Sequence, residues 1–417
     1  MVGEKSFAKD FWKIFLLIFS TNTLTTILGA IAVEMIPQTA LNSVEEIGVI
    51  NSIFLITAGL TSFIWATIAD KTERKRLLVV CCGIWTTAAF FTIFTNDFVG
   101  LLITQMVTAV GYGGVLPISY SLNLDLIATE KRAQSFTVLQ VGITLGNGLG
   151  LLLPGVLVDF LPWWVAFLIF SIVGLITFIR ILSIKEPGRG AIDGFAEGVS
   201  YKIKLEDFKE IVKIKSNLLM LGYVFTKIIA VGAINFYFIT FLEIDHQFSS
   251  SLASISMILI FSSQLSAPLF GRFADKQYEK RKTAKVEMIF LIVVVGSILY
   301  MIGFSLDFTV IDLAMVIIFY LLIIGAAFIF SADGPIGQSI YGDLNPPQYR
   351  STLYSISYIF DTMGQSLGVI LLGIFYISFG TYRMAFVSVG IILMLSSIFM
   401  IPLRKTVLKD LDYLELK

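Results

Sequence analysis

Twelve apolar runs dominate the sequence, and they restrict what the chain can fold into more than any other feature. A helix of about 20 apolar residues crosses the hydrocarbon core of a bilayer. Only helices and closed barrels satisfy their backbone hydrogen bonds in lipid, and runs this long are typical of helices. The predicted spans are 11–37, 47–69, 77–96, 98–123, 134–158, 161–184, 217–243, 249–271, 286–306, 308–340, 351–379 and 381–403. We therefore expect an all-α integral membrane protein with twelve transmembrane helices.

The composition excludes several other classes of protein. Hydrophobic residues make up 56% of the chain and charged residues 14%, whereas a soluble domain carries about 25% charged residues. The formal net charge is +0, so no overall basic field attracts nucleic acid. Cys81 and Cys82 are the two cysteines; they are adjacent in an apolar run and cannot build a metal site. We expect no enzyme, no catalytic residues, no metal and no cofactor.

The positions of the basic residues predict the orientation. All 30 Lys and Arg except Lys227 and Arg383 lie at or near one set of loops, which includes both termini. Cytoplasmic loops carry the excess of Lys and Arg. Both termini are therefore predicted to be cytoplasmic, as an even number of spans requires, and we expect a multi-pass protein of the plasma (inner) membrane.

The longest polar stretch, residues 185–216, divides the spans into two sets of six. We expect an N-terminal half at 1–184, a cytoplasmic linker at 185–216, a C-terminal half at 217–403 and a cytoplasmic tail at 404–417. Within the linker, apolar residues recur at helical spacing between positions 204 and 215, with charges on the other face. This pattern predicts a short helix that lies on membrane lipids or tethers the two halves.

The two halves repeat each other. An offset of 218 residues pairs Pro117 with Pro335, Asp125 with Asp343, Arg132 with Arg350, Gly146 with Gly364, Gly150 with Gly368 and Gly155 with Gly373. An offset of 205 pairs Ala69-Asp70-Lys71 with Ala274-Asp275-Lys276. Duplicated halves are typical of secondary transporters, in which a site near the bilayer midplane is exposed alternately to the two sides.

Two loops carry a family resemblance. The stretch from Ala66 to Arg76 (ATIADKTERKR) resembles the signature loop of the major facilitator superfamily, as does Gly271 to Lys276 (GRFADK). With twelve spans, a central loop and a duplicated half, the resemblance covers essentially the whole chain. A narrower resemblance links Lys185 to Ala191 (KEPGRGA), and the segment from Pro117 to Arg132, to spinster-like facilitators. Those proteins are associated with lysolipids and sphingosine phosphate.

The resemblance implies gating roles for the charged loops. Asp70 is expected to contact the start of the eleventh span, where the helix dipole favours negative charge. Lys71, Arg74 and Lys75 would add charge pairs that break when the cytoplasmic side opens, and Asp275 and Lys276 would do the same in the second half. These residues would otherwise be ordinary loop charges. Arg132 and Arg350 each follow an Asp by seven residues, a spacing that suits either cytoplasmic latches or plain helix-end charges.

Ionisable residues inside the spans are the candidate site, because a charge in lipid is costly. Lys227 and Asp361 each lie ten residues into their predicted spans, near the midplane. Lys227 would bind an anionic group of the substrate, with Asp361 as its counter-ion when the site is empty. The alternatives are a structural Lys–Asp pair and a lysine that extends to the surface. Glu34 and Asp333 are candidate coupling residues for protons or another ion.

Uncharged polar and small residues complete the prediction. Tyr112, Tyr120, Asn235 and Tyr358 suit a cavity for an amphipathic small molecule, although helix–helix hydrogen bonds use the same residue types. Gly146, Gly148, Gly150, Gly364 and Gly368 are expected to let helices approach closely.

We expect a monomeric secondary transporter, either a symporter or an antiporter, that moves a small organic solute by alternating access. The candidate solutes are anions and amphiphiles. The alternatives are a non-transporting receptor on the same scaffold and a multidrug efflux antiporter.

Overall fold

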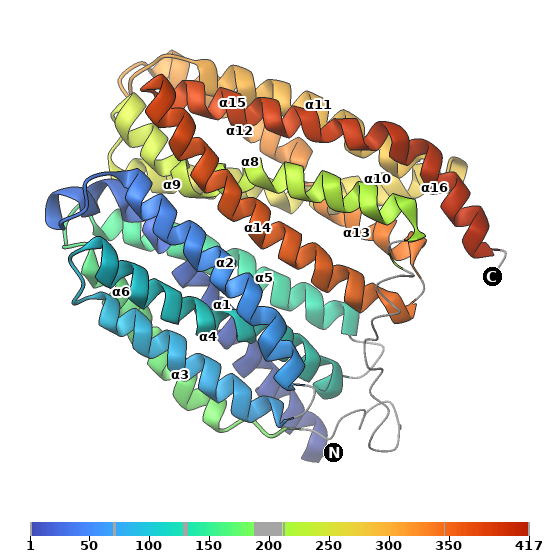
Figure 1. Cartoon of the computed structure of the whole chain (residues 1–417), viewed down its shortest axis with the longest axis horizontal. Coiled ribbons are helices and arrows are strands. Elements are labelled where there is room, and N and C mark those ends of the chain that lie inside the picture. Colours follow the sequence, from blue (N-terminus) through green and yellow to red (C-terminus); the bar gives the residue numbers. More distant parts are fainter. Residues whose placement is uncertain are drawn as a thin grey trace. The chain divides into compact units, whose positions relative to one another are not determined.

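The structure is a computed structural model that describes residues 2–69, 72–127, 132–186, 211, 213–345 and 347–415. Every regular element in these residues is an α-helix or a short 3-10 helix (Figure 1). The elements before the linker are α1 (Val2–Met35), η1 (Ile36–Gln38), α2 (Val44–Ala69), α3 (Arg74–Thr92), α4 (Phe98–Leu126), α5 (Arg132–Leu157) and α6 (Trp164–Leu182).

The helices after the linker are more often interrupted. The elements there are α8 (Lys215–His246), α9 (Ser250–Ser262), η3 (Ser263–Ser266), α10 (Ala267–Lys280), α11 (Ala284–Ser305), α12 (Leu313–Phe330), α13 (Asp333–Leu344), α14 (Pro347–Phe379), α15 (Tyr382–Leu395), η4 (Ser396–Phe399) and α16 (Met400–Glu415). Eleven stretches of the described residues are long and apolar enough to cross a membrane, and α9 is a shorter apolar helix at the predicted eighth span. The all-α membrane fold is confirmed.

Two predicted spans are interrupted. The eighth consists of α9, η3 and α10, and the tenth is divided between α12 and α13 at Ser331 and Ala332. The hydroxyl of Ser266 donates to the carbonyl of Ser263 at 2.6 Å, and that of Ser331 donates to the carbonyl of Phe328 at 2.7 Å. Such local bonds compete with the regular helix pattern. Pro335 has no N–H to donate back to residue 331, so α13 starts afresh at Asp333.

The structure describes part of the predicted tail and little of the predicted linker helix. In the expected tail at 404–417, α16 continues to Glu415. Most of the predicted linker helix at 204–215 lies outside the described residues.

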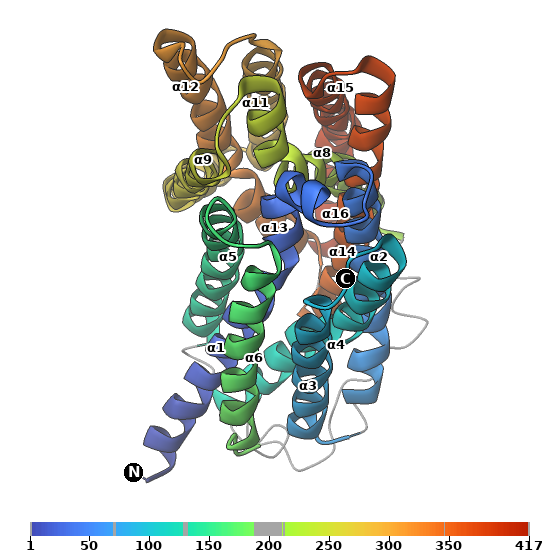
Figure 2. The same cartoon turned by 90° about the vertical axis from the view of Figure 1, so that its left-hand side faces the viewer.

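The chain forms two compact units. The first comprises residues 1–200 with 249–254, and the second comprises 201–248 with 255–417. In the first unit α1 packs on α5 and α6, while α4 packs on α2 and α3 (Figures 1 and 2). In the second unit α8 packs on α14 and α15, and α11 packs on α12 and α15.

Glycines make the corresponding helix contacts close in both units. A Cβ on Gly150 of α5 would lie 2.1 Å from the carbonyl oxygen of Thr23 in α1. A Cβ on Gly368 of α14 would lie 1.9 Å from the carbonyl oxygen of Ile229 in α8. The predicted close packing is therefore confirmed at these two positions, as it is at Gly146 and Gly364. It is wrong for Gly148, where a Cβ would meet nothing within 4 Å.

Large apolar side chains remain exposed along the described helices, among them Leu60 (61%), Phe63 (60%) and Leu321 (69%). Soluble monomeric proteins rarely expose so much apolar surface. A lipid environment accounts for it.

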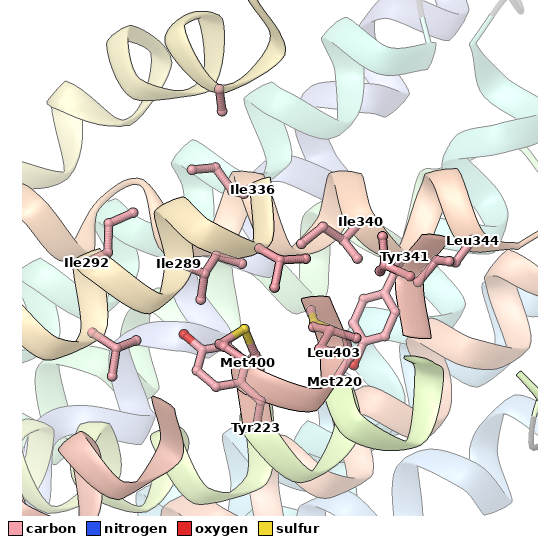
Figure 3. Packing of buried hydrophobic residues seen from close by; sticks show 14 of the residues in the cluster. Met220, Tyr223, Ile289, Ile292, Ile336, Ile340, Tyr341, Leu344, Met400 and Leu403 are labelled. Atoms are coloured by element: carbon pink, nitrogen blue, oxygen red, sulfur yellow. The ribbon is translucent and has the colours of Figure 1, made fainter. Parts of the chain in front are cut away.

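A buried apolar cluster fills the second unit where α8, α11, α13 and α16 meet (Figure 3). It includes Met220 and Tyr223 of α8, Ile289 of α11, Ile340 of α13 and Leu403 of α16. This cluster fixes α8 against α13, the two helices that carry the charged groups described next.

Candidate substrate and gating sites

Lys227 and Asp333 form an ion pair inside the second unit. The Nζ of Lys227, on α8, lies 2.5 Å from Oδ2 of Asp333, the first residue of α13. The Lys227 side chain is 16% exposed and that of Asp333 is 5% exposed. An acidic residue in the first turn is also stabilised by the helix dipole. The sequence had suggested Asp361 as the counter-ion of Lys227. That expectation is wrong, because the direct counter-ion is Asp333.

Tyr223 completes the group, and sequence reasoning missed it. Its hydroxyl donates a hydrogen bond to Oδ1 of Asp333, and its side chain is 1% exposed. Tyr223 precedes Lys227 by four residues on α8, so both side chains lie on one helix face. That spacing was the signal that could have revealed it.

Asp361 lies nearby on α14. Its Oδ2 accepts a hydrogen bond from Nε2 of Gln365 at 2.8 Å, and it interacts electrostatically with Lys227. The structure thus brings together one ammonium and two carboxylates from α8, α13 and α14. We call Lys227, Asp333, Tyr223 and Asp361 the charged cluster.

Arg74 anchors the predicted first gating loop within its own unit. Its Nη1 lies 2.5 Å from Oδ2 of Asp125 on α4, and its Nε lies 3.1 Å from Oε1 of Glu186. The Arg74 side chain is 3% exposed. One largely buried guanidinium therefore serves two carboxylates from different parts of the unit.

Glu186 also caps α3. Its two carboxylate oxygens accept hydrogen bonds from the backbone N–H groups of Arg74 and Lys75, each at 3.0 Å. The first N–H groups of a helix have no partner within it, so a remote carboxylate satisfies them and complements the dipole. The residue lies in the segment that resembles spinster-like proteins, and the sequence alone indicates no role for it.

The second unit contains a matching pair. Nζ of Lys285, near the start of α11, lies 2.9 Å from Oδ2 of Asp343 on α13 and 2.5 Å from the hydroxyl of Ser339. Asp125 and Asp343 are the repeat-related residues. In each unit, a cation at the start of one helix therefore binds the repeated Asp of another.

The remaining gating residues are only partly visible. Asp70 and Lys71 lie outside the described residues, as do the side chains of Asp275, Arg132 and Arg350. Lys276 is exposed on α10. Their gating and latch roles stay predictions.

The predicted uncharged site residues are divided between the two units. Tyr112 of α4 donates to Oδ1 of Asn22 at 3.4 Å, and Tyr120 packs edge-on against Phe136, with ring centroids 5.3 Å apart. Both lie in the first unit. Asn235 and Tyr358 are half-buried on α8 and α14 of the second.

Glu34, a predicted coupling residue, lies near the end of α1 and accepts a hydrogen bond from the hydroxyl of Ser250 through Oε1. Asp159 accepts a backbone hydrogen bond from Ser251 at 3.1 Å. These two carboxylates hold the first turn of α9, which belongs to the first unit. The described residues contain no group of acidic, His and Cys side chains arranged to hold a metal ion.

Solved structures share this fold. A bacterial homologue of the human lysosomal transporter spinster, in an inward-facing and unoccupied conformation, superposes with a TM-score of 0.80 at 17% identity, covering 97% of this chain and 98% of that one. A point mutant of the nucleoside transporter NupG superposes with a TM-score of 0.69 at 16% identity, covering 95% and 99%.

Curated relatives match over shorter stretches. Protein spinster of Drosophila melanogaster is 24% identical over 178 residues, which cover 42% of this chain and 29% of that protein. Synaptic vesicle glycoprotein 2C of Mus musculus is 29% identical over 87 residues, covering 21% and 12%. The matched stretch thus spans less than a third of either relative's length. The model of the Major Facilitator Superfamily matches residues 14–333. Over three quarters of the sequence therefore carries that family's pattern, and the chain belongs to the major facilitator superfamily of membrane transporters.

Proposed function

We propose that this protein is a secondary active transporter of a small organic solute with a negatively charged group, and that Lys227 binds that group. The single observation behind the proposal is a partly exposed lysine side chain in the middle of α8, held by an aspartate side chain that is more deeply buried. A polar or charged group inside a span is costly and is retained for a function.

The resemblance to spinster-like proteins, which are associated with lysolipids and sphingosine phosphate, supports an amphiphilic solute with a phosphate group. Asn235 and Tyr358 would add hydrogen-bonding groups in the same unit as Lys227, and Arg74 and Lys285 would maintain the loops that open and close. The solute would cross by alternating access of the two units.

Replacing Lys227 by methionine is expected to abolish anion binding. The panel for the purified protein contains benzoate, citrate, oleoyl lysophosphatidate, glucose, leucine and tetraphenylphosphonium. A ligand at a hundred times its dissociation constant adds about 2.7 kcal/mol to native stability, which a melting curve resolves. We expect stabilisation by an anion in wild type and none in Lys227→Met.

Two further variants control this comparison. Lys227→Met/Asp333→Asn removes both charges, so it tests anion binding without stranding a buried carboxylate. Lys409→Met removes an exposed lysine of α16 and should behave like wild type. Stabilisation by glucose or tetraphenylphosphonium alone, unchanged in Lys227→Met, would contradict the proposed anion site. Uptake of the stabilising anion into proteoliposomes then separates a transporter from a receptor, which would bind without flux.

A further inference from the structure

The two side chains of the Lys227–Asp333 ion pair differ in burial. Both carboxylate oxygens of Asp333 are occupied, Oδ1 by the hydroxyl of Tyr223 and Oδ2 by the ammonium of Lys227. The Lys227 side chain is 16% exposed, whereas the Asp333 side chain is 5% exposed. Lys227 is therefore the more accessible member of the pair, and it is also the member whose charge attracts an anion.

The charged cluster has only one cation for its two carboxylates, so an added anion competes with them for Lys227. Lys227 is the one cation paired with either carboxylate among the residues that the structure describes. Asp361 is hydrogen-bonded to Gln365, which is neutral. If an anion took over the ammonium, Asp333 would be left as a buried carboxylate with no counter-ion. Burial makes an unpaired charge costly, and a carboxylate escapes that cost by binding a proton.

We propose that an anionic group binds Lys227 by displacing Asp333, and that Asp333 takes up one proton in the same step. This inference rests on the proposed function for the charge of the solute. The new O–H bond forms on Oδ2 of Asp333, and the proton comes from water on the side to which the site is open. Lys227 stays an ammonium throughout, and no other covalent bond changes. One anion and one proton then cross together, so the protein is a proton-coupled symporter.

Tyr223 acts as a positioning residue in this exchange. Its hydroxyl donates to Oδ1 of Asp333, whereas the ammonium of Lys227 donates to Oδ2, so the departure of the ammonium frees Oδ2 for the proton. The ring of Tyr223 also lies 5.4 Å from Nζ of Lys227. The π-face gives the displaced ammonium an attractive neighbour that carries no charge.

Asp361 is the competing proton acceptor, and geometry places it second. It contacts Lys227 through electrostatic interaction alone and keeps its hydrogen bond from Gln365 when the ammonium moves. Asp333 loses a direct partner at 2.5 Å. The proton therefore goes to Asp333.

Infrared spectroscopy of the reconstituted protein tests the proton acceptor without any solute. Lys227→Met removes the ammonium permanently, as an arriving anion does temporarily. We expect this variant to gain the carbonyl band of one protonated carboxyl group at neutral pH. The band should be absent from Lys227→Met/Asp333→Asn and present in Lys227→Met/Asp361→Asn. In Lys227→Met/Tyr223→Phe it should move to higher frequency, because the carbonyl of Asp333 loses its hydrogen bond.

The opposite results would overturn the inference. They are a Lys227→Met spectrum with no new band, and a band that survives Asp333→Asn but disappears with Asp361→Asn. If Lys227→Met unfolds, the band can be sought in Lys227→Ala at lower temperature. The neutral double variant Lys227→Met/Asp333→Asn remains the reference spectrum.

Proton coupling is tested with the anion that stabilises wild type in the panel above. Co-binding of one proton weakens anion binding about tenfold per unit rise in pH. We expect that slope in wild type and a flat profile in Asp333→Asn, which should still exchange the anion across the membrane but no longer accumulate it under an imposed pH gradient. A flat profile in wild type would refute the coupling. If no anion stabilises the protein, the proposed solute class fails, while the infrared result still decides the proton acceptor.

Discussion

Replacing Arg74 by alanine is expected to destabilise the first unit by about 3–5 kcal/mol, the range for breaking a buried ion pair from one side. The guanidinium is 3% exposed and binds Asp125 and Glu186. Without it, both carboxylates lose the cation that they share. Chemical denaturation of the purified protein in detergent measures the loss.

Arg76→Ala is the matched control, since it removes the same side chain two residues away. Arg76 pairs with Glu73 at 2.5 Å, but the two side chains are 78% and 59% exposed. Exposed pairs contribute about 0–1 kcal/mol. Adding Asp125→Asn to Arg74→Ala should recover part of the stability, because it removes the charge of a carboxylate that has lost its ion pair with Arg74. Equal losses in Arg74→Ala and Arg76→Ala would show that Arg74 is not buried as described.

Gly150→Ala is expected to separate α5 from α1 and to cost about 1–3 kcal/mol, the usual range for overpacking, with this site at its upper end. The added methyl group would lie 2.1 Å from the carbonyl oxygen of Thr23 and 2.4 Å from Oγ1 of Thr26. The nearest atom belongs to the backbone, so a side-chain rotation cannot relieve the overlap. A thermal melt of the detergent-solubilised variant reports the loss.

Gly148→Ala provides the comparison on the same helix. Nothing lies within 4 Å of a Cβ at this position, and alanine is more favourable than glycine inside a helix by about 0.5–1 kcal/mol. This variant should equal or exceed the wild type in stability. If both substitutions had the same effect, the close approach of α5 to α1 would be wrong.

The membrane fold could be predicted because its signals are local. Lipid requires long apolar helices wherever a chain crosses it, so the run of apolar residues alone identifies a span. The same reasoning overlooked the break between α12 and α13, because Ser331, Ala332 and Asp333 occupy only a few positions in an otherwise apolar stretch. The sequence also showed no sign that residues 404–415, in the predicted tail, continue the helix α16.

The small-residue pattern shows where the prediction from sequence stops. The repeat of Gly146 and Gly150 at Gly364 and Gly368 indicated close helix packing, and the helices do approach there. Gly148 shares the helix and the residue type, but its position faces open space. The difference depends on the direction in which the neighbouring helix lies.

For the charged groups, the amino-acid sequence was enough to single out the exceptional residues. Lys227, Asp333 and Asp361 stand out because charges are rare in apolar runs, and counting along a helix predicts their depth. Their partners became known only from the folded arrangement of the helices. Lys227 and Asp333 are separated by 106 residues, and Arg74 and Asp125 by 51. A contact over such a separation depends on which faces of two helices meet. The packing of α8 on α13, and of α3 on α4, determines this, because ion pairs form only over a few ångströms.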